Sequence, residues 1–239
     1  MQFSVVGDHD PFLLVKLSRG EAAYANSDSL VLMDASLEMK AKMQGGLFAA
    51  LARTFANDES FFTEYLEATG GAGEALLAPT VPGDIQLLNV GSRQYCLADG
   101  AFLAAESSVN IKTRTQSLSR ALFGGNSGFF VMCTEGQGQV AICGFGSIFE
   151  LEVHPGNDVV IDNQNLVAWD STLHYEVSLS TRSRNRGLLS KLMNSALSGE
   201  GFVTRFSGGG KVYVCSRNRQ QFNTYLAGQI LPAMGTSSE

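Results

Sequence analysis

The sequence predicts a mostly β protein built from three tandem copies of one strand-rich unit. Two observations support this prediction. A motif of one acid, two small residues and then apolar, polar and apolar residues occurs three times, and strand-like alternation continues after it. A glycine also precedes each acid at nearly constant spacing, at Gly20, Gly91 and Gly156. Such a repeated register is typical of repeat architectures.

The acids Asp34, Glu106 and Asp170 mark the same point in each copy. An apolar run ends at each acid and predicts a buried strand. The alternation that follows predicts a second strand with one face on a core and one face in water. The apolar runs are residues 30–33, 102–105 and 166–169, and the alternating segments begin at residues 37, 109 and 173.

A short helix and a hairpin are expected to complete each copy. In the first copy Leu47, Leu51 and Phe55 lie on one helical stripe. Glycine-rich turns then predict hairpins, because glycine readily adopts positive φ. The expected helices are residues 47–55, 118–123 and 188–197, and the expected turns are residues 70–73, 136–138 and 208–210.

These elements divide the chain into three expected β repeats and a tail. The repeats are residues 1–84, 85–154 and 155–232, and residues 233–239 are expected to form a flexible end.

Composition excludes several classes of partner. The 239 residues include 17 basic and 23 acidic side chains, which gives no overall attraction for nucleic acid or anionic membranes. The N-terminus lacks the pattern of a secretory signal, and no apolar run is long enough to span a membrane. We therefore expect a cytoplasmic protein.

The three acids could in principle line a metal or ligand site at each repeat junction. An acid followed by small residues at a bend more commonly accepts backbone N–H groups in a turn. We expect this structural role for Asp34, Glu106 and Asp170, and we expect no metal or cofactor.

Cysteines and histidines offer no catalytic constellation. Neither CxxC spacing nor a paired histidine accompanies the cysteines, so buried reduced thiols are expected at Cys96, Cys133, Cys143 and Cys215. The histidines His9, His154 and His174 stand in unrelated contexts and are expected at the surface. The run at residues 207–211 resembles a phosphate loop only superficially, because Arg205 and Val212 replace the residues that such a loop needs.

Arginines concentrate in the third copy. Residues 1–154 hold 9 basic and 17 acidic side chains, whereas residues 155–239 hold 8 and 6. Five arginines form a candidate patch that either meets the acidic first copy of a neighbouring chain or binds an anion, since the guanidinium fork binds two oxygens at once. They are Arg182, Arg184, Arg186, Arg217 and Arg219.

Several stretches together resemble one bacterial family of uncharacterised proteins, which is related to the mitochondrial "altered inheritance of mitochondria 24" proteins. They are residues 33–34, 45–48, 59–62, 78–79, 82–85, 168–170 and 199–202. That family is similar in fold to the tryptophan RNA-binding attenuation protein, whose small β-sandwich subunits join edge to edge in a ring.

The resemblance implies that each copy is one β-sandwich, so that three chains would close a ring of nine repeats. No segment matches the attenuation protein's tryptophan- or RNA-binding motifs. We therefore expect a homotrimeric, non-enzymatic scaffold or interaction protein. The alternative is a module that binds a small ligand, RNA or another anion at the repeat junctions.

Overall fold

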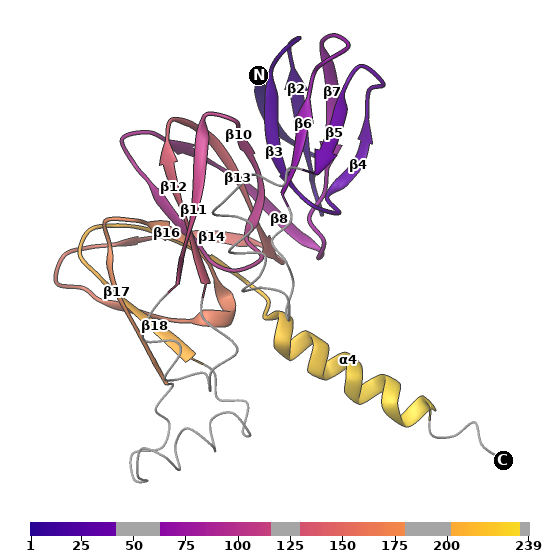
Figure 1. Cartoon of the computed structure of the whole chain (residues 1–239). Helices are drawn as coiled ribbons and strands as arrows, with labels where there is room; N and C mark the ends of the chain where they lie inside the picture. Colours follow the sequence, from indigo (N-terminus) through magenta and orange to yellow (C-terminus); the bar gives the residue numbers. More distant parts are fainter. Residues whose placement is uncertain (42–62, 116–129, 180–201, 235–239) are drawn as a thin grey trace, which may run out of the picture.

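Most of the described part of the chain folds into antiparallel β-structure. The computed structural model describes residues 1–41, 63–115, 130–179 and 202–234. Their strands form four sheets, and one α-helix follows the last strand (Figure 1). The prediction of a mostly β protein is therefore confirmed.

Strands from distant parts of the sequence alternate within the sheets. The first sheet contains, in spatial order, β1 (Gln2–Val6), β2 (Phe12–Leu17), β7 (Gly73–Leu77) and β4 (Leu30–Met33). The second contains β5 (Glu38–Ala41), β6 (Thr63–Glu67), β3 (Ala22–Asn26), β10 (Phe102–Glu106), β13 (Gly138–Phe145) and β8 (Gly83–Val90).

The third and fourth sheets contain the later strands. The third contains β11 (Val109–Thr115), β12 (Phe130–Gly136), β9 (Tyr95–Leu97), β16 (Leu166–Asp170), β19 (Gly210–Cys215) and β14 (Ile148–Val153). The fourth contains β15 (Val159–Asp162), β18 (Phe202–Ser207) and β17 (His174–Leu179), with a 3-10 turn at Asn163–Asn165.

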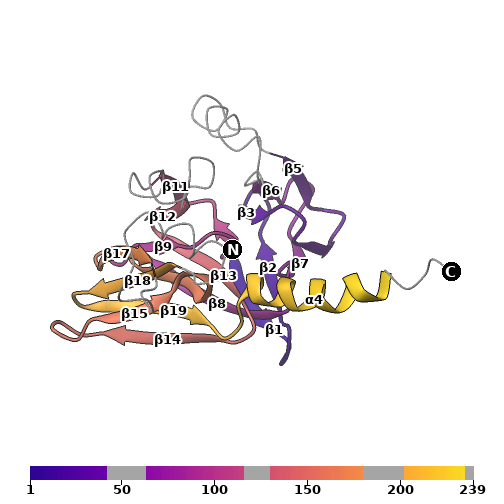
Figure 2. The same cartoon turned by 90° about the horizontal axis from the view of Figure 1, so that it is seen from below.

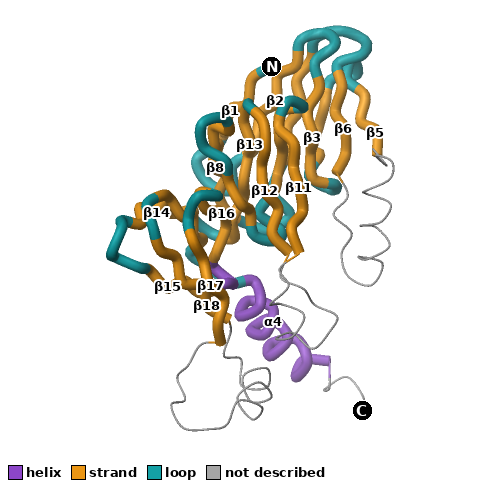
Figure 3. Tube along the Cα trace, turned by 60° about the vertical axis from the view of Figure 1, so that its left-hand side comes forward, coloured by secondary structure: helices purple, strands orange, loops and turns teal. Residues whose placement is uncertain are grey.

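Two antiparallel strand pairs join the successive parts of the chain. In the second sheet β3 pairs with β10, with Ala25 opposite Ala104. In the third sheet β9 pairs with β16, with Leu97 opposite Ala168. All four side chains are fully buried. The sheets consequently follow one another from the N-terminal strands to β17 and β18 (Figure 3).

The expected hairpins are wrong, although the turns occur. β6 pairs with β3 and β5, whereas β7 pairs with β2 and β4. The same separation holds for β12 and β13 and for β18 and β19, so each turn carries the chain from one sheet to another. Gly136 has a φ of 102°, and a Cβ there would lie 2.6 Å from the carbonyl oxygen of Ser108. The reversal therefore requires glycine, but glycine does not determine which strands pair.

Three clusters of buried apolar side chains stabilise the sheets. The largest fully buried side chain is Trp169 in the third cluster. Its ring meets those of Tyr175 and Phe206 edge to face, at centroid distances of 5.2 and 5.6 Å. All five residues of β16 are buried, so both faces of the strand that carries Trp169 are covered, as the continuous apolar run in the sequence predicts.

The helix α4 (Arg219–Met234) is not predicted by the sequence analysis. The Asn218 side-chain oxygen begins it by accepting the N–H of Gln221 at 2.9 Å. The Phe222 ring packs edge to face on that of Phe145 at 5.1 Å. Beyond this contact the helix leaves the strands, and its C-terminal end lies past them in the view from below (Figure 2).

The three helices expected between strands lie outside the described residues, because they fall at residues 47–55, 118–123 and 188–197. The first two residues of the expected flexible end, 233 and 234, belong to α4.

Replacing Trp169 with alanine should lower the free energy of unfolding by about 3–5 kcal/mol, since it removes the largest side chain of the third cluster. Urea denaturation followed by far-UV circular dichroism measures this loss. Phe149→Ala is the matched control, because Phe149 is 65% exposed on β14 and should change stability by less than about 0.5 kcal/mol. Equal losses in the two variants would contradict the assigned core.

Candidate functional site

The three acids hold the ends of strands in place. Each carboxylate accepts a backbone N–H from the residue at or near the start of the strand that follows a glycine turn. The N···O distances to Asp34 and Asp170 are 2.8 and 2.9 Å. Asp34 accepts the N–H of Glu74, Glu106 accepts that of Gln139, and Asp170 accepts that of Lys211. These carboxylates therefore join two strands by the side-chain to backbone contacts typical of turns.

These acids do not converge on a common site. Asp34 follows β4 in the first sheet, Glu106 ends β10 in the second, and Asp170 ends β16 in the third. Among the described residues, no group of three His, Cys, Asp or Glu side chains could hold a metal ion.

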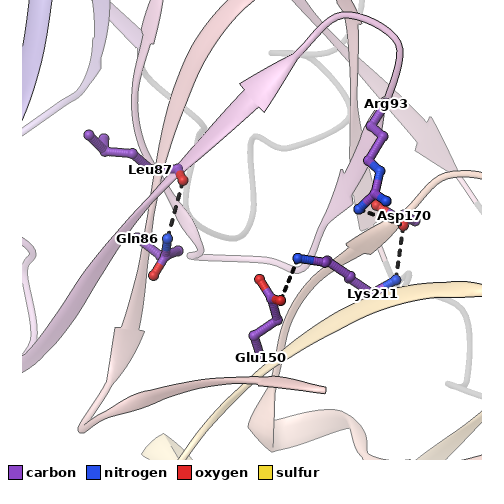
Figure 4. A network of polar contacts seen from close by, with 6 residues as sticks. All are labelled: Gln86, Leu87, Arg93, Glu150, Asp170 and Lys211. Carbon is purple, nitrogen blue, oxygen red and sulfur yellow. Dashed lines mark hydrogen bonds and ion pairs between the residues drawn. The ribbon is translucent and has the colours of Figure 1, made fainter. Parts of the chain in front are cut away.

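Asp170 is buried and belongs to a network of polar contacts (Figure 4). Its Oδ2 lies 3.9 Å from Nη1 of Arg93, and Nζ of the neighbouring Lys211 contacts Oε1 of Glu150 at 2.5 Å. Its Oδ1 and the Trp169 Nε1 are buried without a hydrogen-bond partner within the described part of the chain. The two cations and two anions balance, so the network presents no excess positive charge to an anion.

Tyr95 and Tyr213 lie beside this network, and their ring centroids are 6.4 Å apart. Burial raises the pKa of Tyr95, and the negative charge of Asp170 raises it further. Burial also raises the pKa of Tyr213, as does its hydrogen bond to Glu150. Both side chains therefore remain neutral phenols at neutral pH, and the Tyr213 hydroxyl donates to Glu150 rather than acting as a nucleophile.

The predicted arginine patch is described only at its C-terminal end. Arg182, Arg184 and Arg186 lie outside the described residues. Arg217 is exposed, with its guanidinium carbon 5.8 Å from the centroid of the Phe145 ring. Arg219 is exposed at the start of α4, and its guanidinium lies against Gly100. Arg217 therefore lies at the loop between β13 and β14, whereas Arg219 lies at the turn between β9 and β10.

All four cysteines are buried, and none of them takes part in a disulfide within the described part of the chain. Burial raises the pKa of Cys143 to about 12, which keeps its thiol protonated and unreactive at neutral pH. The three histidines, His9, His154 and His174, lie at the surface. Of the helices in the described residues, none has the length and apolar character needed to cross a membrane.

Two apolar sheet edges are the feature that the sequence analysis missed. β4 ends the first sheet and β15 ends the fourth, so one side of each strand has no partner strand among the described residues. We call them the β4 edge (residues 30–33) and the β15 edge (residues 159–162). Leu32 is 50% exposed and Val160 is 63% exposed. A signal was present in the sequence, because neither Leu30–Met33 nor residues 159–161 contain a charge.

Comparison with known proteins identifies the family. The family model described as AIM24, "Mitochondrial biogenesis AIM24", matches residues 3–217. The chain belongs to the AIM24 family. The resemblance noted in the sequence is thereby confirmed.

The AIM24-family chain is also similar to two streptococcal proteins. It is 35% identical over 234 residues to an uncharacterized protein of Streptococcus pyogenes serotype M6, covering 95% of this chain and 88% of the other. It is 32% identical to a protein of Streptococcus pyogenes of known crystal structure, with a TM-score of 0.77 and coverage of 95% of this chain and 99% of the other. These similarities support the architecture and assign no reaction to it.

The stability of this AIM24-family chain should depend on pH through Glu106. Burial raises the pKa of this carboxyl above its ordinary value of 4.5. The folded state then binds its proton more readily than the unfolded state, so this stabilisation is complete below the unfolded pKa and is lost as pH rises through the folded pKa. Glu106→Gln should therefore gain stability relative to the wild type between about pH 4 and about pH 7.

Urea denaturation at both pH values measures this change. Glu176→Gln is the control, since its carboxylate is 71% exposed on β17 and should show no comparable relative gain. A relative loss of stability in Glu106→Gln as pH rises would contradict the assignment.

Proposed function

We propose that this AIM24-family chain is a non-enzymatic scaffold, in which three β-sandwich repeats per chain assemble with two further chains into a closed ring. The repeats are strands β2–β7, β8–β13 and β14–β19. The support comes from strand pairing, from the use of the acids in turns, and from the unpaired edges at the two ends of the series.

Strand pairing is the first support for three repeats. In each group the first strand pairs with the sixth, and the sixth with the third. The fourth strand likewise pairs with the fifth, and the fifth with the second. Two three-stranded layers per group are what a small β-sandwich requires.

A shared irregularity is the second support. The register between the third and sixth strands shifts by one residue in every group, at Val31, Leu103 and Val167. A β-bulge is a specific local feature, and its recurrence at one position favours duplication over coincidence. The repeats that we propose on this basis span about residues 12–77, 83–145 and 148–215, with β14 in the third repeat rather than in the second, as the sequence analysis had it.

The observation that carries the proposal is the pair of unpaired edges. Consecutive repeats share a sheet through β3 with β10 and β9 with β16. The β4 edge and the β15 edge occupy the same places at the two ends of the series. A head-to-tail contact between chains would pair both, and such a contact forms a ring whenever its rotation closes. Closure at three chains rests on the similarity to the attenuation-protein ring.

The first and third repeats also differ in net charge, and this difference favours contact between them. Residues 1–84 hold 5 basic and 12 acidic side chains, whereas residues 155–239 hold 8 basic and 6 acidic. A basic end that meets an acidic end favours head-to-tail over head-to-head contact. We prefer this use of the third-repeat arginines over an anionic ligand, because the polar network at the junction of β9 with β16 is charge-balanced.

The purified chain should have a mass of about three times 25.6 kDa by size-exclusion chromatography with light scattering. The apolar contact at each edge should keep this mass constant as the protein is diluted through the micromolar range. A folded monomer at these concentrations would refute the ring. Reproducible turnover of a common ester, phosphoester or glycoside, abolished by one point substitution, would refute the non-enzymatic assignment.

A further inference from the structure

We propose that β15 of one chain pairs antiparallel with β4 of the next chain in a defined register, with Asp34 opposite Val159, Met33 opposite Val160 and Leu32 opposite Ile161. This inference rests on the proposed self-assembly and names the surface and the partner that it uses. The partner is a second copy of this chain, because the chain already uses the same contact twice internally.

The acids identify the residue next to β4 from which the register can be counted. At the two internal junctions, Glu106 stands opposite Ala23 and Asp170 stands opposite Tyr95. Asp34 is the corresponding acid after β4, since all three accept a backbone N–H in the same way. Asp34 should therefore face the residue of β15 that corresponds to Ala23 and Tyr95.

The pairing of β15 with β18 identifies that residue as Val159. Val159 faces Phe206 of β18, just as Ala23 faces Leu66 of β6. Phe206 and Leu66 are themselves equivalent, because each faces the final residue of the repeated motif. Once Asp34 is opposite Val159, antiparallel pairing places Met33 opposite Val160 and Leu32 opposite Ile161.

The hydrophobic clusters show what is missing at the end of the chain. Besides Ile85, the first cluster includes four side chains that the second repeat supplies, namely Leu103, Ala104, Ala141 and Cys143. The second cluster includes the four at the same positions of the third repeat, namely Val167, Ala168, Tyr213 and Cys215. The third cluster receives no such set from the described residues, and Val159 and Ile161 are only partly buried in it.

The first repeat carries a corresponding set that remains partly or fully exposed. Its members are Val31, Leu32, Leu76 and Ala78. The equivalence is direct, because Leu32 pairs with Leu76 as Ala104 pairs with Ala141 and as Ala168 pairs with Tyr213. Val31 and Leu32 are 52% and 50% exposed, whereas their internal counterparts are at most 2% exposed. The neighbouring chain would therefore complete the third cluster with this set.

The composition of the edges also favours pairing. Exposed edge strands normally carry charges that prevent association. β5 follows this rule with Glu38 and Lys40, and β14 follows it with Glu150 and Glu152. β4 contains no charged residue, and β15 contains only Asp162 at its end. An apolar edge of this kind suits strand addition by a partner.

Cysteine cross-linking tests the register. The N–H of Ala98 bonds to Val167, and that of Ser171 bonds to Gln94, so Leu97 and Ala168 form a closely spaced, non-hydrogen-bonded pair. Leu32 and Ile161 occupy the corresponding positions. The variant L32C/I161C should form disulfides between chains and give species up to three chains on a non-reducing gel. The native cysteines will not interfere, because each is at most 8% exposed.

The matched control for register is L32C/V159C, whose Cα atoms would be offset by two residues, at about 7–8 Å, and should not cross-link. A trimeric mass with cross-links only in L32C/V159C, or in neither variant, would overturn the register and leave the proposed scaffold intact. A monomeric wild type would instead refute the scaffold itself. Reducing conditions should return L32C/I161C to the wild-type mass, which shows that the variant folds.

A charge introduced at the edge gives an independent measurement. Val160→Lys should convert the assembly to folded monomers, because it places a cation in the strand pair while leaving the isolated chain unchanged at an exposed site. Phe149→Lys is the matched control, since Phe149 is equally exposed on β14. Circular dichroism confirms folding and light scattering gives the mass. An unaffected trimer in Val160→Lys, or dissociation in Phe149→Lys alone, would overturn the proposed interface.

Discussion

The rest of the structure depends on the pairing of β3 with β10 and of β9 with β16. Backbone N–H and C=O groups at a sheet edge need partners when they are buried, and each of these pairs supplies them across the boundary between successive parts of the chain. Ala25 and Ala104 lie at the first boundary, where their small side chains let the two layers share one core. The buried clusters therefore extend across these strand pairs. Separating either strand pair would expose apolar side chains to water.

The carboxylates of the three acids fix the strands that follow the glycine turns. The chain changes sheets between its last two strands in every group, so no hairpin hydrogen bonds hold those strands together. A carboxylate at the end of the third strand instead fixes the start of the sixth strand, with which the third strand pairs, by accepting an N–H there, as Asp170 does from Lys211. The same residues that look most like ligands in the sequence are consequently occupied by the backbone. This is the physical reason for favouring a scaffold over a catalyst.

The strands could be predicted from the sequence, whereas their partners could not. Alternation of apolar and polar residues depends on local geometry, so the strands around Asp34, Glu106 and Asp170 were found at the expected places. The choice between a hairpin and a crossing to another sheet depends on contacts between distant residues, and the glycine at position 136 is compatible with both. α4 escaped prediction because residues 220–234 have no charge and no single apolar stripe to mark a helix. Its one clear signal was the capping Asn218.

The candidate surface was harder to predict than the fold, because an unpaired edge is defined by what neighbours it lacks. The sequence of Leu30–Met33 is typical of a buried strand, and the strands with the same pairing pattern, β10 and β16, are buried. Only the strand order places it at the end of a sheet. Head-to-tail assembly would bury the apolar side chains of both edges at once. The exposed apolar residues that then remain include Phe149 and, on α4, Tyr225 and Leu226. In the proposed assembly these side chains would stay at the surface, because none of them belongs to the β4 edge or to the β15 edge.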